Sequence, residues 1–126
     1  MKKIVCVVGT RPEAIKMAPV IQALRACSKF ETIVLGTAQH RQMLDQALAQ
    51  FDLKVDIDLD AMTPGQSLSI LTSRLFEKID RVLATTSPDL VLAQGDTTTV
   101  FVTAVVCFYR RIPFGHVEAG LRTHDL

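Results

Sequence analysis

Tryptophan is absent from this 126-residue sequence, tyrosine occurs once, and cysteine occurs only three times. The cysteines Cys6, Cys27 and Cys107 lie far apart in apolar surroundings and form no CxxC pair. This spacing argues against a disulfide framework and against a cysteine-rich metal site. We therefore interpret the three residues as small buried side chains in a reducing, cytoplasmic compartment, and we expect no bound metal.

A strong excess of charge of either sign is also missing. The formal net charge is +1 and the basic residues are scattered, which gives no support for a nucleic-acid or membrane surface. The pair Arg110-Arg111 stands at the expected end of a helix, where it would complement the helix dipole. The longest apolar stretch, residues 100–109, is too short to cross a membrane, and the apolar run after Met1 lacks a signal-peptide cleavage site.

Hydrophobic residues make up 48% of the chain, which is enough for a folded domain with one core. Patterns typical of buried strands alternate with amphipathic patterns typical of helices. The strands are expected at residues 4–8, 32–35, 55–59, 90–93 and 113–117, and the helices at 10–27, 41–51, 68–83 and 97–110. This alternation predicts an α/β fold with a doubly wound, Rossmann-like parallel sheet.

Right-handed crossovers would bring the carboxyl ends of all these strands to one edge, where ligands bind beside the first strand. Polar motifs follow four of the predicted strands: Gly9-Thr10-Arg11-Pro12-Glu13, Gln39-His40-Arg41, Gly95-Asp96-Thr97-Thr98-Thr99 and Gly115-His116-Val117-Glu118-Ala119-Gly120. With the expected strand order 3-2-1-4-5, Arg11, Asp96 and Glu118 would lie within reach of one small ligand.

The first motif is neither the dinucleotide GxGxxG fingerprint nor a Walker P-loop. It still places a glycine and a helix N-terminus at the ligand edge, with Thr10 as N-cap and Glu13 completing a capping box. Free backbone amides there suit a phosphate, and Arg11 and Lys16 could add cationic contacts. The alternative is that Arg11 and Lys16 are solvated residues at the start of a helix.

The acidic and imidazole side chains also have structural alternatives. Asp96 precedes three threonines and would make a good N-cap. Glu118 ends a strand that looks buried, so it must be partnered or functional, because an unpaired buried carboxylate is destabilising. His116 is interpreted as a core histidine with satisfied hydrogen bonds, whereas Gln39 and His40 either cap the second helix or line the ligand crevice.

Taken in order, the four motifs resemble the start of the bacterial, non-hydrolysing UDP-N-acetylglucosamine 2-epimerases. The resemblance covers the whole chain, and its most specific block is Gly115-His116-Val117-Glu118-Ala119-Gly120-Leu121-Arg122-Thr123. It implies that residues 1–126 are an incomplete N-terminal domain of a two-domain protein of the glycosyltransferase-B type. A C-terminal nucleotide-binding domain and a homodimer would complete the protein, and the 126-residue chain alone is expected to be inactive.

The resemblance also implies an activity. Such enzymes interconvert UDP-N-acetylglucosamine and UDP-N-acetylmannosamine for surface polysaccharides, through loss of UDP to a 2-acetamidoglucal and its re-addition, without a cofactor. Alternatives are a hydrolysing epimerase and a truncated nucleotide-sugar-binding domain. A response-regulator receiver is disfavoured, because Gly9-Thr10-Arg11 replaces the acidic residues that it needs after the first strand.

By position in the motifs, Arg11 and Lys16 would bind substrate, and Asp96 and Glu118 would belong to the acid/base group. A second, activating sugar nucleotide would be held by four further positions: Gln39, His40, Gln42 and Gln66. Regulated relatives have an arginine beside that last glutamine, whereas this chain reads Thr63-Pro64-Gly65 before it, which argues against activation. Gln94 stands where many relatives have a histidine.

Overall fold

The computed structural model describes residues 1–37, 41–61 and 63–118. Within them, strands and helices alternate along the chain, which confirms the predicted α/β class. The strands are β1 (Lys2–Val8), β2 (Phe30–Gly36), β3 (Ile57–Asp58), β4 (Leu90–Gln94) and β5 (Phe114–Val117), and the helices are α1 (Arg11–Ala26), α2 (Arg41–Ala49), α3 (Leu68–Thr86) and α4 (Thr98–Arg110).

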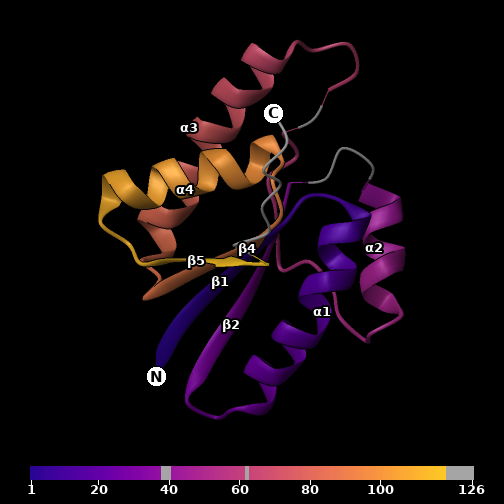
Figure 1. Cartoon of the computed structure of the whole chain (residues 1–126), viewed down its shortest axis with the longest axis vertical. Helices are drawn as coiled ribbons and strands as arrows, with labels where there is room; N and C mark the ends of the chain where they lie inside the picture. Colours follow the sequence, from indigo (N-terminus) through magenta and orange to yellow (C-terminus); the bar gives the residue numbers. More distant parts are fainter. Residues whose placement is uncertain (38–40, 62, 119–126) are drawn as a thin grey trace, which may run out of the picture.

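The strands form one sheet in the order β3-β2-β1-β4-β5, and every neighbouring pair is parallel. The predicted order 3-2-1-4-5 is therefore confirmed. The order reverses between β1 and β4, the position at which open α/β sheets bind ligands. Figure 1 shows α1 and α2 on one face of the sheet and α3 and α4 on the other.

Strand β1 is buried on both faces. Val5 and Val7 pack into the core on the α3 and α4 side, together with Leu75, Ile79 and Val102. The alternate residues Ile4, Cys6 and Val8 pack into the second core, against Met17 and Ile21 of α1. Because successive side chains of a strand point to opposite faces, an apolar run of this kind suits the centre of a doubly covered sheet.

Local capping fixes where the helices begin. The Thr10 hydroxyl accepts a hydrogen bond from the Glu13 amide at 3.4 Å, as expected for the start of α1. The Ser67 hydroxyl does the same for α3, accepting from the Ile70 amide at 3.2 Å. Helix α1 continues through Pro19, whose side chain is exposed, so this proline does not end the helix.

Strand β3 differs from the expectation, since it spans two residues instead of 55–59. Asp56 is exposed, and its carboxylate accepts a hydrogen bond from the Val34 amide at 2.8 Å and pairs with Arg25 at 2.9 Å. A side chain thus replaces part of the backbone ladder at this edge. No helix among the described residues is long and apolar enough to span a membrane.

Candidate functional site

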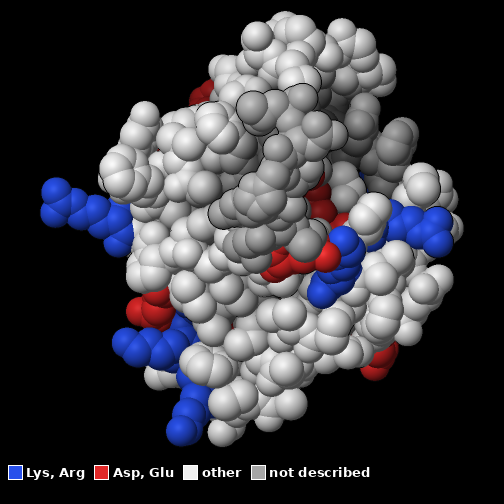
Figure 2. Space-filling view, viewed as in Figure 1, with Lys and Arg blue, Asp and Glu red and all other residues white. Residues whose placement is uncertain are grey.

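The carboxyl ends of β1, β4 and β5 meet at one edge of the sheet, which we call the carboxyl edge. Register fixes this, because Val7 of β1 pairs with Ala93 of β4, and Ala93 pairs with His116 of β5. The residues that follow these strands therefore emerge side by side. In the view of Figure 2, acidic and basic side chains adjoin one another near the centre of the molecule, where the strands of Figure 1 end.

Glu118 lies directly after β5 and is held by two side chains from other elements. Lys16 of α1 donates from Nζ to Oε2 at 2.8 Å and to Oε1 at 3.1 Å. Gln94 at the end of β4 also donates from Nε2 to Oε2. We call Glu118, Lys16 and Gln94 the Glu118 cluster. It joins segments that are 102 residues apart in sequence, and no local pattern required this.

The Glu118 cluster is open to a ligand and keeps its acid ionised. The side chains of Lys16 and Glu118 are 51% and 36% exposed, so a ligand can reach them. The hydrogen bond from Lys16 lowers the pKa of Glu118, and the bond from Gln94 acts in the same direction. The sequence predicted that Glu118 is either partnered or functional. In the structure its carboxylate is partnered and exposed.

Arg11 and Asp96 also lie at the carboxyl edge, but they are not in contact with the Glu118 cluster. Both are exposed, and neither makes a hydrogen bond or ion pair with another described residue. Arg11 stands at the first residue of α1, and it lines a small cavity of about 100 Å³ with Gln46 of α2 and with Gln50, which directly follows α2. The structure therefore places Arg11 and Asp96 at the predicted edge and leaves both without a protein partner among the described residues.

The interpretation of Asp96 as an N-cap is wrong. The N-cap of α4 is Thr97, whose backbone is extended (φ −76°, ψ 168°) and whose side chain makes no capping bond. Gly95 has φ +97°, a conformation that favours glycine, and this turn carries Asp96 out of the helix before capping begins. The carboxylate of Asp96 is thereby left exposed at the sheet edge.

The interpretation of His116 as a core residue is also wrong. Its side chain is exposed, and its Nε2 lies 2.6 Å from the carbonyl oxygen of Gly95. The ring stacks on Phe114, with the ring centroids 6.3 Å apart. The ring has a hydrogen-bond partner, as expected, but this bond joins β5 to the β4–α4 turn at the surface and does not lie in the core.

Glu13 is a site residue that the sequence showed only as part of a capping box. Its carboxylate is buried, and Oε1 accepts a hydrogen bond from the Gly9 amide at 2.9 Å instead of from the N-cap amide. The space around Gly9 is full, since a Cβ there would lie 2.6 Å from Thr37 Oγ1 and 3.1 Å from Thr99 Oγ1. A packed polar layer thus lies under the carboxyl edge.

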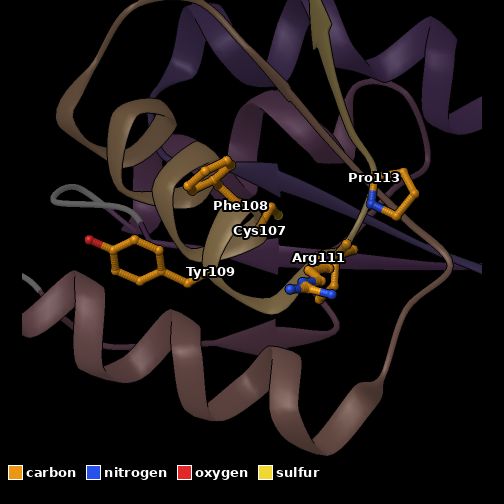
Figure 3. Close-up of a pocket in the computed structure, with 6 residues that line it drawn as sticks. Cys107, Phe108, Tyr109, Arg111 and Pro113 are labelled. Carbon is orange, nitrogen blue, oxygen red and sulfur yellow. The ribbon is translucent and has the colours of Figure 1, made fainter.

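A second hollow, of about 740 Å³, lies away from this edge (Figure 3). Its lining includes Phe108, Tyr109 and Arg111 at the C-terminal end of α4, which is the end opposite Thr98 and the carboxyl edge. Burial raises the pKa of Cys107, which also lines it, to about 11, so this thiol is not a nucleophile near neutral pH. We therefore take the carboxyl edge as the candidate functional site.

A family model described as UDP-N-acetylglucosamine 2-epimerase matches residues 22–126. The chain belongs to this family. The UDP-N-acetylglucosamine 2-epimerase of Salmonella typhimurium is 55% identical over 124 residues, which cover 98% of this chain and 33% of the relative. The enzyme of Escherichia coli K12 shows the same identity and the same coverage. The chain thus spans about a third of the length of these relatives.

Solved structures of UDP-N-acetylglucosamine 2-epimerases share this fold. The Neisseria meningitidis enzyme, bound to UDP-GlcNAc, has a TM-score of 0.93 and 51% identity, covering 98% of this chain and 33% of its own. The Methanocaldococcus jannaschii enzyme, in complex with UDP-GlcNAc and UDP, has a TM-score of 0.88 and 33% identity, covering 98% and 34%. These neighbours have a GT-B-like fold, as predicted for this chain.

The positions that the epimerase resemblance linked to a second nucleotide are only partly described. Gln39 and His40 lie outside the described residues, and Gln42 is exposed on α2. The Gln66 amide oxygen lies 3.4 Å from Nη1 of Arg74, which also donates to Thr63 at 2.9 Å. Arg74 of α3, eight residues further along the chain, therefore lies next to Gln66 in space.

Proposed function

We propose that this chain is the N-terminal, substrate-gripping domain of a non-hydrolysing UDP-N-acetylglucosamine 2-epimerase. In this proposal the complete protein has a second, nucleotide-binding domain, acts as a homodimer in the cytoplasm, and converts UDP-N-acetylglucosamine to UDP-N-acetylmannosamine for surface polysaccharides. The observation that carries the proposal is the Glu118 cluster, an ionised acid held by a lysine at the carboxyl edge, where Asp96 also lies without a partner among the described residues.

The proposed reaction begins at C2 of the sugar. A carboxylate removes the C2 proton while UDP leaves from C1, which gives a 2-acetamidoglucal. UDP then adds back to C1, and C2 receives a proton on the opposite face of the ring. Two acids are needed on different sides of the sugar, and Asp96 and Glu118 follow neighbouring strands whose axes are about 4.8 Å apart.

The charges at the carboxyl edge suit these two acids. The ion pair with Lys16 keeps Glu118 ionised near neutral pH and also makes it a weaker base. Asp96 has no such cation among the described residues. The two carboxylates therefore stand in different environments, a common arrangement where one acid donates a proton and another accepts one.

The leaving diphosphate needs positive groups nearby, whose interaction with it becomes stronger as negative charge develops on the leaving group. Arg11 stands at the N-terminus of α1 with a free guanidinium among the described residues, and helix N-termini attract anions. Lys16 lies further along the same helix, at the Glu118 cluster. We propose that these two cations hold the diphosphate and the reacting sugar, respectively, at one edge of the sheet.

Product analysis tests the proposal. The full-length protein is incubated with UDP-N-acetylglucosamine, and the products are separated by anion-exchange chromatography. UDP-N-acetylmannosamine is expected as the sole new sugar nucleotide, whereas free N-acetylmannosamine with UDP would show a hydrolysing enzyme instead. The 126-residue chain assayed alongside is expected to give no conversion, because the proposed second domain is missing.

A further inference from the structure

Only one of the two carboxylate oxygens of Glu13 has a hydrogen-bond partner among the described residues. The residue is 3% exposed, and Oε1 accepts the hydrogen bond from the Gly9 amide. Its other oxygen, Oε2, is buried and has no hydrogen-bond partner among the described residues. An acid in the first turn of α1 interacts favourably with the helix dipole, and its charge strengthens the bond from the Gly9 amide. Neither effect needs the second oxygen, whose burial without a partner is destabilising. The fold among the described residues therefore leaves one acceptor of Glu13 unused.

The Glu13 side chain lies between the two turns that carry the exposed site residues. It holds the β1–α1 turn, which precedes Arg11, through the amide of Gly9. It also lies close to the β4–α4 turn, since a Cβ built on Gly95 would lie 3.9 Å from Glu13 Cγ. That turn carries Asp96. One buried side chain thus lies beside both turns, the one that precedes Arg11 and the one that carries Asp96.

The β4–α4 turn has hydrogen-bond donors to offer. The Thr97 hydroxyl is buried and has no partner among the described residues, and the amide of Asp96 donates to none of them. Among the described residues, an unfilled acceptor and unfilled donors therefore lie on neighbouring segments. A small movement of the turn would join them, and burial would make such a bond strong.

We propose that Glu13 is a positioning residue of the epimerase site. Oε1 fixes the β1–α1 turn at all times, and Oε2 accepts a hydrogen bond from the β4–α4 turn when the nucleotide sugar binds. The bond sets Arg11 and Asp96 at the separation that the reaction needs. This inference rests on the function proposed above, and it concerns a residue that does not itself touch the reacting atoms.

The substitution Glu13→Gln in the full-length protein tests the role of Oε2, because glutamine keeps an acceptor for Gly9 and offers an NH2 group that cannot accept. We expect kcat to fall by about tenfold or more while KM changes by less than about threefold, since a small misplacement of reacting groups acts on the transition state. The melting temperature should stay close to that of the parent. Glu77→Gln, on the exposed face of α3, is the matched control with unchanged kinetics.

A kcat of Glu13→Gln within about twofold of the parent, at unchanged melting temperature, would overturn the proposal, because one acceptor would then suffice. Hydrogen exchange of the unsubstituted protein gives a second test if the variant does not fold. The amides of residues 95–97 should become more protected when UDP-N-acetylglucosamine is added, and unchanged exchange there would overturn the proposal. A parent protein that forms no UDP-N-acetylmannosamine would instead refute the proposed function, and this inference with it.

Discussion

We expect Gly9→Ala to destabilise the domain, because there is no room for a methyl group at this position. The added Cβ would lie 2.6 Å from Thr37 Oγ1 and 3.1 Å from Thr99 Oγ1. These two hydroxyls are buried and hydrogen-bonded to each other at 3.0 Å. Neither can retreat without breaking that bond, so the backbone of the β1–α1 turn must shift or the pair must separate.

The expected loss follows from these two effects. Overpacking of a buried site costs about 1–3 kcal/mol, and a broken buried hydrogen bond adds about 1 kcal/mol. We therefore expect the free energy of unfolding to fall by about 2–4 kcal/mol. For a domain of this size, each kcal/mol lowers the melting temperature by about 4 °C, which predicts a loss of roughly 8–16 °C.

Thermal melts of the 126-residue chain, followed by circular dichroism, measure the effect. Gly115→Ala is the matched control, since its Cβ would meet Leu92 Cδ2 at 2.4 Å, but this is the end of a flexible side chain with the next neighbour at 3.9 Å. We expect the control to lose less than about 1 kcal/mol, because the leucine can rotate away. A Gly9→Ala protein that melts with the parent, or above Gly115→Ala, would refute the reasoning.

A double-mutant cycle makes the test more specific to the Thr37 contact. Thr37→Ala should destabilise the parent by about 1 kcal/mol, because the partner hydroxyl of Thr99 is left unpaired. In the Gly9→Ala background the same change removes the closest clash, so it should be neutral or stabilising. Strictly additive losses would show that the two positions do not interact.

Further predictions concern the full-length enzyme. Asp96→Asn and Glu118→Gln should each lower kcat by about 10²–10⁴-fold without changing the circular dichroism spectrum, and a near-normal rate in either variant would remove that residue from the acid/base group. Lys16→Met removes the cation that lowers the pKa of Glu118, so that pKa should rise and more of the carboxylate be protonated at mildly acidic pH. The acid limb of the kcat profile should therefore move to higher pH, while Lys29→Met, an exposed lysine elsewhere, should leave it in place.

The sheet was predictable because its signals are local. The run Ile4–Val8 is apolar at every position, which suits a strand covered on both sides, and the structure buries all five residues. The handedness of the crossovers placed the motifs at one edge, whereas the strand order was the one expected of a doubly wound sheet and was not fixed by the sequence. Strand β3 was overestimated the most, and there the Asp56 carboxylate takes the hydrogen bond of the Val34 amide.

The hydrogen bonds and ion pairs between side chains at the carboxyl edge were less predictable, because they depend on the length of each side chain and on the geometry of the turns. Asp and Thr are both good N-caps, and only the positive φ of Gly95 decides that Thr97 takes the position. The contact between Lys16 and Glu118 joins residues far apart in sequence. His116 alternates with apolar residues, as a core residue would, but it lies on the edge strand β5 and is exposed.

The burial of two of the cysteines makes this chain convenient to label. Burial raises the pKa of Cys6 to about 12 and that of Cys107 to about 11, so both resist maleimide reagents at neutral pH. Cys27 is only half-buried and caps the C-terminal end of α1, the end remote from Arg11. A fluorophore or spin probe attached there would lie at the opposite edge of the sheet and would leave free the carboxyl edge, where the ligand is proposed to sit.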